Sequence, residues 1–155
     1  MRFVTQISAD EGREIARPTD SRRDPAALRT RLDAWLKTKA GPSATVTELS
    51  APSANGMSSE TLLADAVWDG AEHPLVIRVA PTPESDPVFP QYDLPGQFQV
   101  IGHVAEHTAG STPGVPLPRL LWCEPDPAPL DAPFFVMERV DGRVPPDVMP
   151  YTFDS

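Results

Sequence analysis

Apolar residues recur at helical spacing in two stretches of the chain. In the first stretch, the apolar positions three or four apart are Leu28, Leu32, Trp35 and Leu36. Asp24 precedes them as a favourable N-cap, Pro25 occupies the first helical position, and Gly41 follows them. The pattern predicts an amphipathic helix of about four turns over residues 25–40.

The second helical stretch begins after Asp93, which is also a good N-cap, and runs to about His107. Its apolar face consists of Leu94, Phe98, Ile101 and Ala105. Gly96 and Gly102 lower its intrinsic helix propensity, so we expect its stability to come from packing against the rest of the molecule.

Five shorter segments have the composition of strands. They cover residues 45–49, 61–68, 75–80, 119–124 and 134–139. Asp69 and Gly70 lie between the second and third segments and predict a tight hairpin turn. The order is one helix, three strands, a helix and two strands. It indicates an α+β fold, with about five mainly antiparallel strands covered by helix on one face.

Composition and charge narrow the class of protein. The chain has 155 residues with 20 prolines and 9 glycines, which suits one loop-rich domain. We expect a cytoplasmic setting, because Cys123 is the single cysteine, no secretory signal opens the chain, and no apolar run approaches a membrane span. Residues 41–155 hold 4 basic and 16 acidic side chains, a balance of -12, so nucleic acid and anionic membranes are not expected partners.

Arg78 lies in the middle of the third predicted strand. Strand alternation places Leu75, Ile77 and Val79 on one face and Arg78 on the other. A guanidinium between apolar neighbours needs an anionic partner, which is either a carboxylate or a bound phosphate. An arginine on an edge strand that reaches solvent fits the same pattern, and the alternation alone does not separate these interpretations.

Four segments, taken in order, resemble the small lobe of the aminoglycoside phosphotransferase-like kinases over residues 28–151. These segments are Trp35-Leu36, Asn55-Gly-Met-Ser-Ser-Glu-Thr61, Val76-Ile-Arg-Val79, and Pro118-Arg119 through Phe134-Phe-Val-Met-Glu138. The resemblance implies a protein-kinase-like small lobe with a leading helix and one C-type helix. It divides the chain into a mobile leader (1–23), the lobe (24–144) and the start of a connection to a second lobe (145–155).

The resemblance also implies an ATP site. The phosphates would meet the loop between the first two strands and the arginine of the third strand, and Gln97 stands where the family commonly has a glutamate that pairs with the strand residue. Met137 would lie near the base, and the following backbone would meet the adenine edge. The implied nucleotide-binding residues are Asn55, Gly56, Ser58, Ser59, Arg78, Gln97, Met137, Glu138, Arg139 and Val140.

The family carries its catalytic aspartate in a His-Gly-Asp loop and binds magnesium through a later aspartate, and this sequence contains no His-Gly-Asp. We therefore assign no catalytic residue and no metal ligand here, and expect magnesium to be held mainly by a second lobe. The chain is expected to be a truncated product or fragment, inactive alone. In the full-length enzyme, a phosphoryl group would pass to a hydroxyl of a small acceptor that the sequence does not identify. The alternative is a non-catalytic binding or scaffolding module; the oligomeric state stays open.

His103-Val-Ala-Glu-His107 matches the H-x-x-E-H pattern of some zinc proteases. Both imidazoles would lie on one helical face, with Glu106 as a candidate general base. Such a site needs a third ligand and a substrate cleft, and the residues after His107 have the pattern of strands and proline-rich loops. The helix dipole also favours histidine near a helix C-terminus for purely structural reasons.

Overall fold

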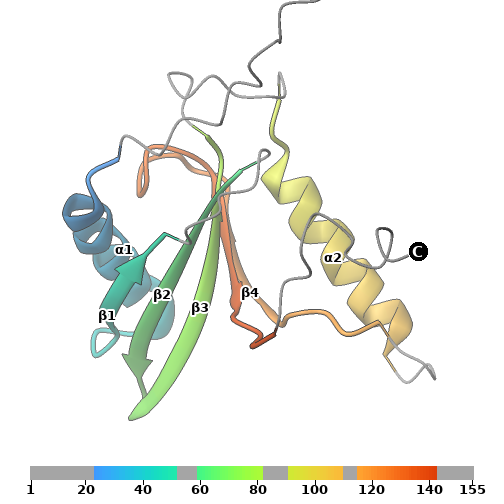
Figure 1. Cartoon of the computed structure of the whole chain (residues 1–155), viewed down its shortest axis with the longest axis horizontal. Coiled ribbons are helices and arrows are strands. Elements are labelled where there is room, and N and C mark those ends of the chain that lie inside the picture. The colour runs from blue at the N-terminus through green and yellow to red at the C-terminus, as the bar shows by residue number, and fades with distance from the viewer. Residues whose placement is uncertain (1–22, 52–58, 82–90, 110–114, 143–155) are drawn as a thin grey trace, which may run out of the picture.

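The computed structural model describes residues 23–51, 59–81, 91–109 and 115–142. Its elements are α1 (Pro25–Ala40), β1 (Thr45–Ser50), β2 (Glu60–Trp68), β3 (Ala71–Val79), α2 (Leu94–Thr108), β4 (Leu120–Glu124) and β5 (Phe134–Glu138). The strands form one antiparallel sheet in the order β1-β2-β3-β5-β4 (Figure 1). The predicted α+β class with a five-stranded antiparallel sheet is confirmed.

Each helix begins directly after the aspartate that the sequence indicates as its N-cap. The Asp24 carboxylate accepts a hydrogen bond from the backbone N–H of Ala26 at 3.1 Å, and the Asp93 carboxylate accepts one from Gly96 at 2.8 Å. These bonds satisfy N–H groups that have no partner within the helix. Neither helix of the described residues is long and apolar enough to cross a membrane.

The β2–β3 hairpin turns at Asp69 and Gly70, whose φ angles are 51° and 74°. Both angles are positive, as a type I′ hairpin turn requires, and aspartate and glycine are among the residues that tolerate this region best. β3 begins at Ala71, four residues earlier than the sequence predicts. Pro74 fits inside it because β5 ends opposite Leu75, so no ladder hydrogen bond needs the N–H that proline lacks.

The two helices lie on opposite faces of the sheet, whereas the sequence suggested helix cover on one face (Figure 1). Trp35 of α1 packs on Phe134 with ring centroids 4.8 Å apart, and Phe98 of α2 packs on Phe135 at 5.8 Å. Consecutive strand residues point to opposite faces, so these contacts place the helices on different sides. The difference arises because Phe134 and Phe135 are both buried, and β5 therefore shows no alternation that would reveal a solvent side.

The face under α1 holds most of the buried core. Every second residue over 62–66 of β2 and 75–79 of β3 is buried there: Leu62, Ala64, Ala66, Leu75, Ile77 and Val79. The intervening residues on the opposite face are only half-buried, because α2 packs mainly on β4 and β5, and the described part of the chain places no other element over this face of β2 and β3. The candidate site lies on this open face.

Candidate site on the open face of the sheet

Arg78 projects from β3 onto the open face, as the alternation predicts. Its Nε donates to the Ser59 hydroxyl at 2.9 Å, and one terminal amino group donates to the same oxygen. Burial lowers the pKa of this guanidinium, because partial removal from water disfavours its charged form. Among the described residues, no carboxylate forms an ion pair with Arg78. The site therefore offers a partly desolvated positive charge whose partner there is a neutral hydroxyl.

Ser59 is buried, with 6% of its surface exposed, directly before β2. By accepting two donors from Arg78, its hydroxyl fixes the orientation of the guanidinium and leaves the other terminal amino group for a further acceptor. The contact of Ser59 within the site is therefore with Arg78. Three other residues of the expected phosphate loop, Asn55, Gly56 and Ser58, lie outside the described residues.

An apolar row crosses the open face next to Arg78. The strand register aligns Leu63 of β2 with Val76 of β3, and Val76 with Met137 of β5. All three side chains are half-buried. They form a shallow apolar surface suited to a flat ring, and they lie one side-chain position, about 7 Å, along the strands from Arg78. The sequence singled out Met137; Leu63 and Val76 follow from the pairing register.

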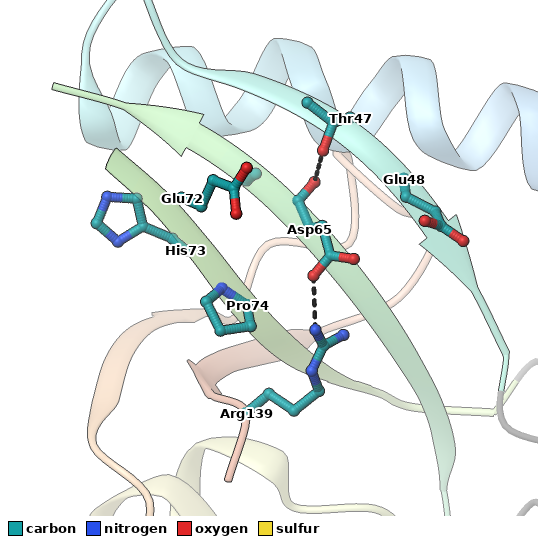
Figure 2. Close-up of a pocket in the computed structure, with 8 residues that line it drawn as sticks. Thr47, Glu48, Asp65, Glu72, His73, Pro74 and Arg139 are labelled. Carbon is teal, nitrogen blue, oxygen red and sulfur yellow. Dashed lines mark hydrogen bonds and ion pairs between the residues drawn. The ribbon is translucent and has the colours of Figure 1, made fainter. Parts of the chain in front are cut away.

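Beyond the apolar row, on the side away from Arg78, the open face carries an ion pair. Arg139 donates to Asp65 at 2.7 Å across Pro74, and its backbone N–H donates to the Pro74 carbonyl at 2.9 Å. Figure 2 shows Arg139 reaching Asp65, whose own carbonyl accepts a hydrogen bond from Thr47 at 3.0 Å. A groove of about 410 Å³ borders this pair. Arg139, predicted at the adenine edge, is therefore tied to β2 and β3 through both its side chain and its backbone.

The end of β5 is bonded to Arg119, the residue directly before β4. The Glu138 backbone N–H donates to the Arg119 carbonyl at 2.9 Å, and Arg119 Nε donates to the Glu138 carboxylate at 2.8 Å. That hydrogen bond lowers the pKa of Glu138. Val140 follows with 68% of its surface exposed, and within the described part of the chain no turn or loop hydrogen bond engages its backbone. Glu138 and Arg139 both use their backbone N–H groups in such bonds, so within the described residues Val140 is the predicted edge residue whose N–H donates none of them.

α2 contributes less to the site than the sequence suggested. The Gln97 side chain is exposed, and the hydrogen bonds of Arg78 go to Ser59 rather than to Gln97. Asp93 caps the helix, as expected. On the same helix, His103, Glu106 and His107 are exposed, and the described residues contain no group of three His, Cys, Asp or Glu side chains arranged to hold a metal ion.

No family model matches the sequence. The crystal structure of a "putative aminoglycoside phosphotransferase" from Ralstonia eutropha JMP134 aligns with a TM-score of 0.47 and 22% sequence identity, over 76% of this chain. This chain spans 29% of that protein's length.

Proposed function

We propose that the chain is the nucleotide-binding lobe of an ATP-dependent phosphotransferase that acts on a small hydroxylated molecule. The observation that carries the proposal is Arg78, a partly desolvated cation held by Ser59 at one end of an apolar row. A phosphate is the ligand that best satisfies such a guanidinium, because its oxygens accept charge-assisted hydrogen bonds. In this pose, the phosphates of ATP lie at Arg78.

The base then lies on the apolar row of Leu63, Val76 and Met137, about 7 Å along the strands from the phosphates. A nucleotide has this shape, because a sugar separates its flat ring from its charged end. The ring edge faces the segment at Glu138 and Val140, where peptide groups recognise it. Asn55, Gly56, Ser58 and Gln97 complete the phosphate side in this proposal.

The proposal assigns catalysis to a second lobe outside these residues. Phosphoryl transfer needs an aspartate that orients the acceptor hydroxyl, and carboxylate or amide ligands for Mg²⁺. The 155-residue chain is then inactive alone and binds ATP weakly, since one side of the nucleotide stays in water. In this proposal the open sheet face binds the donor nucleotide, and the small acceptor contacts mainly the second lobe.

Calorimetric titration of the 155-residue protein with ATP tests the proposal. We expect Arg78→Met to weaken ATP binding by about tenfold or more, the loss of one charge-assisted phosphate contact. Arg31→Met is the matched control. This substitution removes the same charge from α1, where the Arg31 side chain forms an ion pair with Asp131. Absence of ATP binding, or equal binding by the wild type and Arg78→Met, would contradict the proposal.

A non-catalytic binding module is the second candidate, and the exposed apolar side chains fit it as well as they fit one lobe of a larger enzyme. Val100 and Val104 of α2 are 62% and 37% exposed, and Val140 is also exposed. Exposed apolar surface of this kind suits contact with another protein surface, whether a second lobe or a separate partner. The two candidates differ in the ATP titration: the binding module shows no stabilisation by ATP, whereas the nucleotide-binding lobe does.

A further inference from the structure

His103 and His107 lie together on the surface of α2, away from the open sheet face. They are four residues apart, so they occupy neighbouring positions on one side of the helix. Their ring centroids are 6.4 Å apart, and both side chains are exposed. Two imidazoles in this arrangement can reach a common ion without any change in the backbone.

A hydrogen bond already orients one of the two rings. His107 Nδ1 lies 2.8 Å from the His103 carbonyl oxygen. Because a carbonyl only accepts hydrogen bonds, Nδ1 carries the hydrogen in this contact and Nε2 of the neutral ring keeps its lone pair. Metal-binding histidines in proteins commonly show this arrangement, with one ring nitrogen donating to a backbone carbonyl while the other binds the ion.

We propose that His103 and His107 form a two-imidazole site for a divalent transition-metal ion such as Ni²⁺, Cu²⁺ or Zn²⁺. These ions favour imidazole nitrogen, whereas Mg²⁺ and Ca²⁺ favour oxygen. Two imidazoles on one tetrahedral ion have centroids about 5 Å apart, so the exposed rings need to approach by about 1 Å through side-chain rotation. Since no three-ligand group is present among the described residues, water completes the coordination. The site is therefore a binding site and not a zinc-protease centre.

The ion would stabilise the second half of α2, where no side chain is fully buried. Leu94 in the first turn is the one fully buried residue of this helix, and Gly102 weakens its second half. A chelate between positions four apart exists only while that turn is helical, so binding favours the helical state. The proposal shares no residue with the nucleotide site and stands or falls independently of it.

The test is calorimetric titration of the untagged protein with Ni²⁺ and Zn²⁺. We expect one ion per chain, and a loss of affinity of about tenfold or more in both His103→Asn and His107→Asn. His73→Asn is the matched control, because His73 is stacked on Trp68 in the β2–β3 hairpin and should leave affinity unchanged. Glu106→Gln should also bind as the wild type does.

Hydrogen exchange supplies a second measurement. Saturating Ni²⁺ should slow amide exchange in the last two turns of α2 in the wild type and leave exchange there unchanged in His107→Asn. The proposal is overturned if the wild type does not bind at about 100 µM ion, a concentration at which a useful chelate would be occupied. It is also overturned if only one histidine matters, or if Glu106→Gln weakens binding as much as loss of an imidazole.

Discussion

The side chain of Glu124 connects α1 to the sheet. Its carboxylate accepts a hydrogen bond from the Trp35 indole at 2.9 Å and lies 3.2 Å from the Lys39 ammonium. It therefore connects β4 to α1 through groups that lie far apart in the sequence. The hydrogen bond from Trp35, supported by Lys39, lowers the pKa of Glu124 despite the opposing effect of burial.

This shift predicts a loss of stability in acid. The folded-state pKa of Glu124 lies below the unfolded value, so the ionised carboxylate stabilises the fold above about pH 4.3 and loses that contribution as pH falls through the folded-state pKa. Glu124→Gln should therefore show a smaller fall in the free energy of unfolding between about pH 5 and pH 3 than the wild type. Urea denaturation across this range measures the difference.

Glu106→Gln is the control for that comparison, because Glu106 is exposed on α2. If Glu124→Gln and the wild type lose the same stability over the acid range, the contacts of Glu124 with Trp35 and Lys39 do not contribute as the structure indicates.

For single residues, the sequence predicted which face of the sheet Arg78 occupies, but local patterns did not predict which side chains it contacts. Period-2 alternation is local, so the face of a strand residue can be read from its neighbours. The bond to Ser59 joins residues 19 apart, and the pair Arg139–Asp65 joins residues 74 apart. Such contacts depend on strand order and register, which local patterns do not encode. The same reason explains why Leu63 and Val76 could not be recognised as neighbours of Met137.

Helix α2 shows how a capping group and a glycine depend on each other. Asp93 accepts a hydrogen bond from the Gly96 N–H, and a Cβ added at Gly96 would collide with the Asp93 carboxylate. The sequence indicated only that Gly96 lowers helix propensity. The structure shows what the glycine provides, which is space for the cap.

Substitution of the two glycines of α2 should therefore have different effects. Gly96→Ala should give no net stabilisation, because losing the cap costs about 1 kcal/mol and offsets the gain in helix propensity. Gly102→Ala should stabilise the protein by about 0.5–1 kcal/mol, since the added Cβ meets Leu120 Cδ1 at 3.6 Å, an ordinary contact. Thermal unfolding of the two variants measures both changes; stabilisation by Gly96→Ala equal to that by Gly102→Ala would contradict the proposed role of the cap.

At the β1 edge of the sheet, side chains of α1 bond to backbone groups that a neighbouring strand would otherwise pair with. The Asp33 carboxylate accepts a hydrogen bond from the Val46 N–H at 2.9 Å, and Arg29 Nε donates to the Val46 carbonyl at 3.2 Å. These side chains satisfy edge groups of β1 that could otherwise pair with another chain. The helix and the strand were each predictable from local pattern, whereas this pairing required their relative placement.

In the whole molecule, the two sheet faces differ in how firmly their helices are held. α1 buries Leu28, Leu32, Trp35 and Leu36 against one face, whereas α2 buries only Leu94 fully. Local opening is easiest where few apolar groups are buried. α2 should therefore open without unfolding of the sheet, whereas loss of α1 packing should affect the entire fold.

Two truncations distinguish local from global opening. Phe98→Ala removes a half-buried ring that packs on Phe135, and should lower the free energy of opening of α2 by about 1–3 kcal/mol while exchange in β2 and β3 changes little. Leu36→Ala empties a position that is 1% exposed, and should lower protection in α1 and in the strands of the sheet by about 2–5 kcal/mol. Native-state hydrogen exchange read residue by residue separates the two patterns. If Phe98→Ala exposed the amides of β2 and β3 as much as those of α2, then α2 would belong to the same cooperative unit as the sheet, and its weaker packing would not make it a separately opening helix.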